Sequence, residues 1–437
     1  MVFGGLTVAA APGVASLFRG VPTVESDVTR SPSLWTLFAP KIAEYPKLTS
    51  SLKVDVAIIG GGFTGLSCAY YLKKLNPNLS VAVIDSHRFG SGASSRNSGA
   101  VSINSPGISD PGFNQRGYDR FRAFIEAEQI DCDFNPTRTL MMLNSDGEVD
   151  EARAKLKPGE TLLGKAELNE RISTDYYAGA IERPAYSTIQ PAKLMFGLVR
   201  SAAKVGVQLY ENTPALSIEH GKRVKIRTGD GVIECTRAVV ATNAYSPRLN
   251  VARGSVFPIH HYTVATPKLA STDLENLGLD RWRLRFDSKA IACTFGLTPD
   301  QHFYMRLPLS YVTSNSEVWP DLKGAHALAE RVCKRHYPSL ANIPFSHGWH
   351  GVTAHTIQFK PVVETIGEGN VYVSVALNGL GIMPGHNFGY LTACKAAGVE
   401  EKDILVLESA SSAIPFPREF YRSIILKAGV SMVNDYY

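Results

Sequence analysis

The chain has 437 residues, of which 44% are hydrophobic and 19% are charged. This composition excludes disordered, fibrous and coiled-coil proteins, and the length predicts two or three packed domains. The formal net charge of +5 comes from charges scattered along the chain, so we expect no nucleic-acid partner. The six cysteines form no C-x-x-C pair. The sequence therefore indicates neither a metal site nor a disulfide framework, and it fits reduced thiols in the cytoplasm.

The two ends of the chain differ in character from its centre. Residues 1–50 precede the first strand pattern, and we expect them to form an N-terminal arm. The first eighteen residues carry no charged side chain, so an export signal is the alternative, although a basic n-region is missing. Residues 404–437 are expected to form a helical tail whose apolar stripe docks on the protein, with contact to a membrane surface as the alternative.

The segment from Val54 to Asp85 reads as a strand, a glycine turn, a helix and a second strand. Both strand patterns are apolar almost throughout, as strands buried on both faces of a parallel sheet must be. Gly60, Gly62 and Gly65 lie between the first strand and the helix, where they permit a tight turn, a close phosphate and close helix packing. Asp85 follows Gly65 by 20 residues, where a carboxylate can accept hydrogen bonds from a ribose. The segment predicts a dinucleotide site.

A second motif distinguishes FAD from NAD. Residues 90–100 read GSGASSRNSGA, a run of small hydroxyl residues with one Arg and one Asn. Such a run can supply donors to a second phosphate and then pass under a flat ring. Here the chain resembles the D-amino-acid oxidase-like superfamily of FAD oxidoreductases, in the branch of gamma-glutamylputrescine oxidase and glycine oxidase. The resemblance covers most of residues 54–398.

The resemblance implies FAD as the cofactor. Covalent relatives tether the flavin through a Cys near the position of Trp349, and this chain has no Cys between Cys333 and Cys394, so we expect non-covalent FAD. The turn that contains Leu380 resembles the family's turn whose backbone faces the flavin, although many relatives have His at that position. The expected FAD contacts are Gly60, Gly62, Phe63, Thr64, Gly65, Asp85, Ser94, Ser95, Arg96, Asn97, Ser98, Gly99, Ala215, Thr242, Gly379, Gly381, Ile382 and Met383.

The order of the motifs predicts a fold of the α/β class, which becomes α+β when the whole chain is considered. A Rossmann-like FAD-binding domain is expected beside a discontinuous substrate domain built on an antiparallel sheet. The FAD-binding domain is predicted to comprise residues 51–109, 184–256 and 341–403, and the substrate domain residues 110–183 and 257–340.

The resemblance implies oxidation of the C–N bond of an amine or amino acid by hydride transfer to flavin N5, followed by imine hydrolysis. Oxygen or another acceptor then takes the electrons. Such chemistry depends more on positioning than on a strong base. Tyr304 and Arg306 alternate on a predicted strand, so we expect them on one face, where Arg306 can bind a carboxylate. His260 and His261 lie on the predicted strand that enters the substrate domain, and only one of them can face the ring.

His355 and Lys360 lie near the predicted flavin turn and are candidates for tuning N5 or aiding oxygen. For every candidate side chain an ordinary packing or surface role is the alternative. The chain has no H-E-x-x-H, Walker or G-x-S-x-G motif, which excludes the usual zinc, phosphoryl-transfer and hydrolase classes. Two other functions remain open, namely a flavoenzyme of the same fold that acts on a non-amino-acid or biosynthetic intermediate, and a non-catalytic FAD-binding protein.

Overall fold

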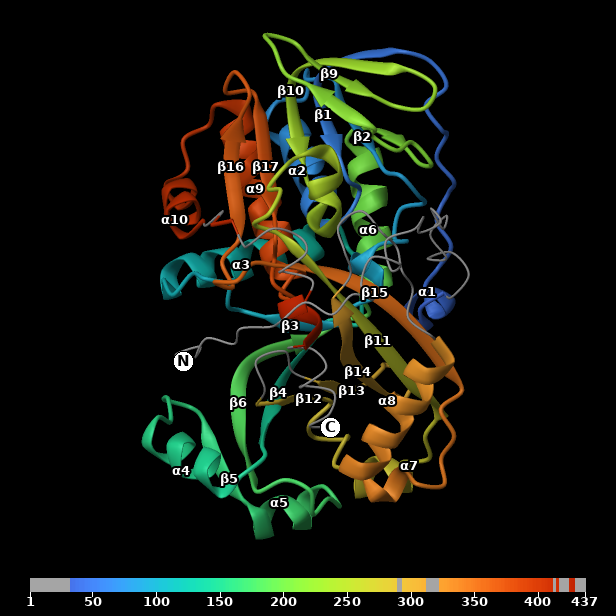
Figure 1. Ribbon diagram of the computed structural model, residues 1–437, viewed down its shortest axis with the longest axis vertical. Coiled ribbons are helices and arrows are strands. Elements are labelled where there is room, and N and C mark those ends of the chain that lie inside the picture. Colours follow the sequence, from blue (N-terminus) through green and yellow to red (C-terminus); the bar gives the residue numbers. More distant parts are fainter. Residues whose placement is uncertain (1–31, 289–292, 312–321, 412–413, 416–423, 429–437) are drawn as a thin grey trace, which may run out of the picture.

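The computed structural model describes residues 32–288, 293–311, 322–411, 414–415 and 424–428. The uncharged first eighteen residues and most of the expected C-terminal tail lie outside these ranges. No helix in the described ranges is both long enough and apolar enough to cross a membrane. The described part folds around two large sheets, one in the upper half of Figure 1 and one in the lower half.

The first sheet has eight strands, and five of them run parallel in the order β17, β10, β1, β2 and β7. β16 pairs antiparallel with β17, and β9 pairs antiparallel with β10. The strands are β1 (Leu52–Ile59), β2 (Val81–Ile84), β7 (Gln208–Tyr210), β8 (Ser217–Glu219), β9 (Val224–Arg227), β10 (Val232–Val240), β16 (Val362–Ile366) and β17 (Val371–Val375). This parallel sheet confirms the Rossmann-like prediction.

The central strands β1 and β2 are mainly apolar because both faces of the sheet are covered there. Val56 and Ile58 of β1 pack against a helical layer, whereas Ala57 and Ile59 face a second core on the opposite side. The helical layer contains α2 (Phe63–Leu75), α6 (Pro191–Lys204) and α9 (Met383–Ala397). The sheet therefore holds the start of α2 at the carboxyl end of β1, where the glycine turn lies.

The second sheet has nine strands, and all of its pairs are antiparallel except β12 with β4. Its strands are β3 (Ala100–Ser102), β4 (Asn135–Leu143), β5 (Thr161–Gly164), β6 (Gly179–Thr188), β11 (Phe257–Lys268), β12 (Leu284–Asp287), β13 (Thr294–Leu297), β14 (His302–Tyr311) and β15 (His347–His355). The helical elements around it are α4 (Asp146–Ala154), α5 (Lys165–Arg171), α7 (Ser271–Asn276), α8 (Leu322–His336) and η5 (Pro338–Leu340). The predicted antiparallel sheet is confirmed.

Three segments lie on the other side of the expected domain boundaries. β3 pairs with β6, and β15 pairs with β11, so both belong to the second sheet. Helix α3 (Pro111–Ala127) packs Phe121 and Phe124 into the core beneath the first sheet. The observed boundaries differ from the expected ones because a segment belongs to the sheet or core that it contacts. These contacts are made with residues that are distant in sequence.

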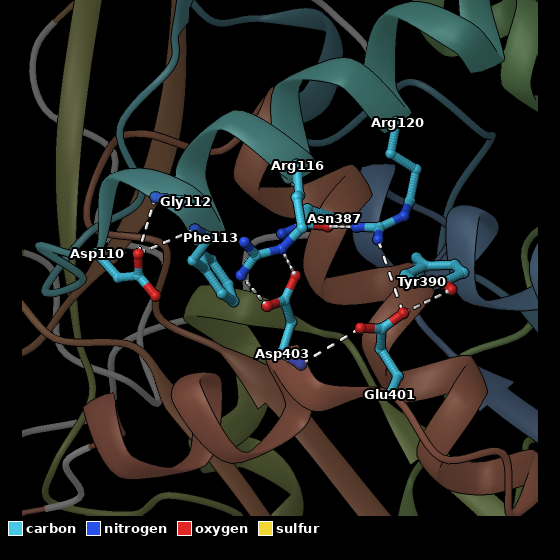
Figure 2. A network of polar contacts seen from close by, with 9 residues as sticks. All are labelled: Asp110, Gly112, Phe113, Arg116, Arg120, Asn387, Tyr390, Glu401 and Asp403. Carbon is cyan, nitrogen blue, oxygen red and sulfur yellow. Dashed lines mark hydrogen bonds and ion pairs between the residues drawn. The ribbon is translucent and has the colours of Figure 1, made fainter.

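A polar network joins α3 to the C-terminal part of the first domain (Figure 2). Arg116 donates from Nε to Oδ2 of Asp403 at 3.0 Å and from Nη2 to Oδ1, and Asp403, on α10 (Lys402–Ala410), is completely buried. The Arg120 guanidinium lies 3.8 Å from the ring centre of Tyr390 and 3.9 Å from Oε2 of Glu401. These contacts fix α3 on α9 and α10.

A short part of the expected C-terminal tail, residues 424–428, lies against the second sheet. Leu426 packs on Phe257 and Ile259 of β11, while Ile424 and Ile425 remain exposed at 54% and 48%. The described residues thus include one apolar contact of the kind expected for this tail.

Replacing Arg116 by Met should lower the free energy of unfolding by about 1–3 kcal/mol, because the carboxylate of Asp403 stays buried without its partner. Urea denaturation measures the change. The matched control is Arg153→Met, whose ion pair with Asp150 is exposed and should contribute less than about 1 kcal/mol. Equal losses in both variants would show that the Arg116 contact is not the stabilising one.

Candidate functional site

A cavity of about 420 Å³ runs from the carboxyl ends of β1 and β2 to the face of β11, β14 and β15. The carboxyl edge of a parallel sheet is the usual place for a ligand in such folds. The cavity therefore spans both sheets, and its lining combines the glycine turn, residues 90–98 and the side chains of the second sheet.

The glycine turn lets the backbone approach the cavity. Gly60 has φ +106°, and a Cβ there would lie 2.7 Å from the carbonyl oxygen of Ala241. A Cβ on Gly65 would lie 1.9 Å from the carbonyl oxygen of Gly60, so Gly65 acts by letting α2 pack on the turn and does not line the cavity. Gly62 is the N-cap residue of α2 and has no side chain to bond the first N–H groups. The turn leaves N–H groups and the positive helix end for an anion.

Asp85 lies at the end of β2 and lines the cavity. Its Oδ2 accepts the N–H of Gly61 at 2.8 Å, and its Oδ1 accepts the N–H of His87 at 3.0 Å. Burial raises the pKa of Asp85, against the lowering effect of these two hydrogen bonds. Ala215 and Thr242 line the same end of the cavity. This end has the polar and apolar groups that an adenosine moiety requires.

The second motif forms η3 (Ala93–Ser95) and the loop that follows it. Five consecutive carbonyl oxygens, from residue 95 to residue 99, each accept a hydrogen bond from another part of the chain. The donors, in order, are Oγ of Ser33 at 2.7 Å, Nε1 of Trp349 at 3.1 Å, Nε1 of Trp35 at 2.7 Å, Oη of Tyr304, and the N–H of Ile189 at 2.9 Å. The N–H groups of Asn97 and Ser98 have no partner among the described residues, and both residues line the cavity. They are free to bind an acceptor.

Arg96 places a positive charge beside this loop. Its Nε donates to the carbonyl oxygen of Ser91 at 2.8 Å, and its Nη1 donates to that of His350 at 3.1 Å. Burial lowers the pKa of Arg96 to about 10, so the side chain stays charged at neutral pH. Ser94 accepts the N–H of Phe63 at 3.1 Å, whereas the hydroxyl of Ser95 donates to Gly90 within the loop.

A strained turn closes the opposite wall. Ala376, Asn378 and Gly379 all have positive φ, of 63°, 49° and 83°. Oδ1 of Asn378 accepts the N–H of Thr356 at 2.9 Å, and its Nδ2 donates to the carbonyl oxygen of Lys360 at 3.0 Å. Lys360 thus acts through its backbone and does not line the cavity.

The turn leads into α9, and its expected contacts divide between the cavity wall and the core. Gly379, Gly381 and Ile382 line the cavity. Met383 is buried in the core next to them and lies outside the cavity lining, as do Ser95 and Gly99.

Of the expected side chains on the second sheet, Arg306 lines the cavity, and Tyr304 and His260 do not. Nη2 of Arg306 donates to Oγ1 of Thr294 at 3.1 Å, its Nε has no partner among the described residues, and burial lowers its pKa. Tyr304 packs on Trp35 at 5.5 Å between ring centres and holds the carbonyl of Ser98. Tyr304 therefore positions the loop behind the cavity.

His261 faces the cavity in place of His260. Its Nε2 lies 2.8 Å from Oγ1 of Thr353, which lies 2.8 Å from Nε2 of His355. Burial lowers the pKa of His261 well below its ordinary value and that of His355 to about 3, and the charge of Arg306 adds to both shifts. Both imidazoles are neutral at physiological pH.

Sequence reasoning missed Thr353, Asn378, Tyr186 and Phe286, which all line the cavity. For Thr353 a signal was present, because it alternates with His355 on one strand. Asn378 directly precedes the predicted flavin turn. Tyr186 and Phe286 occupy segments that no short motif marks, and only the folded chain brings them together.

These groups fit a dinucleotide with a second ring system, since unpaired N–H groups, a buried guanidinium and a carboxylate follow one another along the cavity. A sequence profile described as FAD dependent oxidoreductase (DAO) matches residues 55–395. The chain belongs to this family, as the sequence motifs predicted, and is an FAD-dependent oxidoreductase.

Two curated relatives cover nearly the whole chain. The probable oxidoreductase OrdL of Rhizobium meliloti is 28% identical over 429 residues, which are 93% of this chain and 97% of the relative. The gamma-glutamylputrescine oxidoreductase of Escherichia coli is 25% identical over 397 residues, which are 85% of this chain and 90% of the relative. The glycine oxidase of Geobacillus kaustophilus has the same fold, with a TM-score of 0.68 at 21% identity over 80% of this chain and 96% of that one.

Replacing Gly65 by Ala should reduce bound flavin to less than about a tenth of the wild-type content, because α2 must move away from the turn. The ratio of flavin absorbance to protein absorbance measures this content. Gly164→Ala is the matched control, since a Cβ at Gly164 meets nothing within 4 Å and should leave the ratio unchanged. Full flavin content in Gly65→Ala would contradict the role of Gly65.

Proposed function

We propose that this protein is an FAD-dependent amine or amino-acid oxidoreductase that oxidises a C–N bond. The observation that carries the proposal is Arg306, whose charged side chain lines the same cavity that contains the dinucleotide motifs. Among the described lining residues Asp85 is the only carboxylate, and it lies at the end formed by the first sheet. The other end therefore favours a substrate that carries a negative group.

Arg306 is built to orient such a substrate. Thr294 fixes one side of the guanidinium, and the burial of Arg306 strengthens its attraction for a carboxylate. The rings of Tyr186 and Phe286, 5.3 Å apart, form an apolar wall in the same cavity. A substrate held by its carboxylate can place its carbon chain against this wall.

FAD, when bound, would supply the oxidant that removes a hydride from the substrate carbon next to nitrogen, and the resulting imine would hydrolyse in water. The chain contributes binding and electrostatics. Ile382 lies at the N-terminal end of α9, where unpaired N–H groups and the helix dipole stabilise negative charge. We propose that the cofactor is held non-covalently, because none of the six buried cysteines lines the described cavity.

The names of the relatives support a nitrogen-bearing substrate, since they include a gamma-glutamylputrescine oxidoreductase and a glycine oxidase. Oxygen or another electron acceptor completes the cycle in this proposal. An amine with a carboxylate elsewhere in the molecule is the substrate class that best fits Arg306.

Anaerobic reduction of the bound flavin tests the proposed function. Amino acids, N-methyl amino acids, polyamines and gamma-glutamyl amines are mixed in turn with the purified holoenzyme, and the visible flavin absorbance is followed. We expect one of these groups to bleach the flavin, and readmitted air then separates an oxidase from a dehydrogenase. A flavin that no amine bleaches would favour a different substrate or a non-catalytic FAD-binding protein.

Replacing Arg306 by Met should raise KM for a carboxylate-bearing substrate by about 30-fold or more, because a buried ionic contact is lost. Steady-state kinetics measure the change. The same variant should treat an amine without a carboxylate much as the wild type does, which supplies the internal control. Equal effects on both substrates would assign Arg306 a structural role.

A further inference from the structure

The loop that follows η3 has two backbone donors that the described protein leaves unused. The N–H groups of Asn97 and Ser98 have no partner among the described residues, and both residues line the cavity. The N–H groups on either side are occupied. That of Arg96 donates to a carbonyl oxygen of η3 at 3.2 Å, and that of Gly99 donates to Oδ1 of Asn97 at 2.8 Å. The loop therefore has one pair of adjacent donors for a ligand.

Each of these N–H groups shares a peptide plane with a carbonyl that an indole holds. The carbonyl of Arg96 belongs to the same peptide as the N–H of Asn97, and it accepts a hydrogen bond from Nε1 of Trp349 at 3.1 Å. The carbonyl of Asn97 belongs to the same peptide as the N–H of Ser98, and it accepts one from Nε1 of Trp35 at 2.7 Å. In a planar trans peptide the C=O and N–H bonds point in opposite directions. An indole that fixes a carbonyl therefore also fixes the direction of the N–H in that peptide.

The two indoles lie next to each other on one side of the loop. The ring centres of Trp35 and Trp349 are 6.5 Å apart, both side chains are buried, and neither belongs to the cavity lining. Because the two carbonyls point toward neighbouring rings, the two N–H groups point together to the opposite side of the loop. Successive N–H groups that point the same way form a concave site for a negatively polarised atom.

Each indole is anchored to a different part of the fold. Trp349 belongs to β15, where it pairs with Thr263 of β11. Trp35 belongs to α1 (Leu34–Phe38), and its carbonyl accepts a hydrogen bond from Nε2 of Gln190 at 2.6 Å. Oε1 of Gln190 in turn accepts two N–H groups at the start of α6, at 2.7 Å and 2.9 Å. The second sheet therefore positions one indole, and the helical layer of the first sheet positions the other.

The course of the loop places the two donors toward the second sheet. Ser94 accepts the N–H of Phe63 at the start of α2, where the phosphate groups of a dinucleotide bind. The carbonyl of Ser98 accepts Oη of Tyr304 on β14, and Arg306 on the same strand lines the cavity. The loop thus leads from the phosphate end of the cavity to the end that contains Arg306, where a ring beyond the phosphates belongs.

We propose that Trp35 and Trp349 are positioning residues of the flavin site, which hold the N–H groups of Ser98 and Asn97 toward the flavin ring. The ring gains negative charge when it is reduced, and two fixed N–H donors stabilise that charge more than they stabilise the oxidised ring. The two indoles thus raise the reduction potential of the bound flavin through the two peptides. This inference requires bound FAD, on which the family depends, and it does not depend on the nature of the substrate.

Trp35→Phe and Trp349→Phe test the proposal because each removes one indole N–H. Titration of the holoenzyme with dithionite beside a reference dye measures the two-electron reduction potential without any substrate. Each variant should weaken the binding of reduced flavin about tenfold relative to oxidised flavin, which lowers the potential by about 30 mV. Trp282→Phe is the matched control and should keep the wild-type potential, since Nε1 of buried Trp282 has no partner among the described residues. Wild-type potentials in both test variants would overturn the proposal.

Amide NMR of isotopically labelled holoenzyme separates positioning from a general loosening of the loop. β-(3-Benzothienyl)alanine in place of Trp35 keeps the ring shape and has sulfur where the indole has N–H, so it also serves if Trp35→Phe retains no flavin. The amide signal of Ser98 should then shift while that of Asn97 stays, because each indole holds one peptide. The analogue in place of Trp349 should have the reverse effect. Two signals that both stay, or that both move, contradict the proposal.

Discussion

The site depends on the way in which the carbonyl oxygens of residues 95–99 are held. Their donors come from the segment before β1, from β14 and β15 of the second sheet, and from the end of β6. These bonds fix the five carbonyl groups, and the unpaired N–H groups of Asn97 and Ser98 remain for a ligand. An unpaired buried donor is costly, and a bound acceptor recovers that cost. The same bonds therefore join the loop to both sheets and leave its donors for a ligand.

Burial sets the electrostatics of the substrate end. The guanidinium of Arg306 stays charged, whereas His261 and His355 become neutral because burial and the nearby guanidinium disfavour a second positive charge. One fixed cation beside neutral hydrogen-bonding groups suits a substrate that combines a carboxylate with an amine. The imidazoles then serve as hydrogen-bond partners of Thr353.

Helix α3 is fixed to the first domain and leads into the second sheet. The ion pair of Arg116 with buried Asp403 and the contact of Arg120 with Tyr390 anchor α3 beside α9 (Figure 2). Ile382, at the N-terminal end of α9, lines the cavity. The chain then enters β4 of the second sheet directly after this anchored helix. These contacts thus join the first domain to the segment that leads into the second sheet.

The sequence by itself determined the parallel sheet, the glycine turn, Asp85 and the loop of residues 90–99, because each is a local pattern whose chemistry acts through neighbouring backbone. Tertiary structure decided which of His260 and His261 faces the cavity, since strand register sets the direction of a side chain. It also separated Arg306 from Tyr304, whose hydroxyl reaches a loop 206 residues away. The place of β15 in the second sheet likewise depends on β11, a partner distant in sequence that no local pattern records.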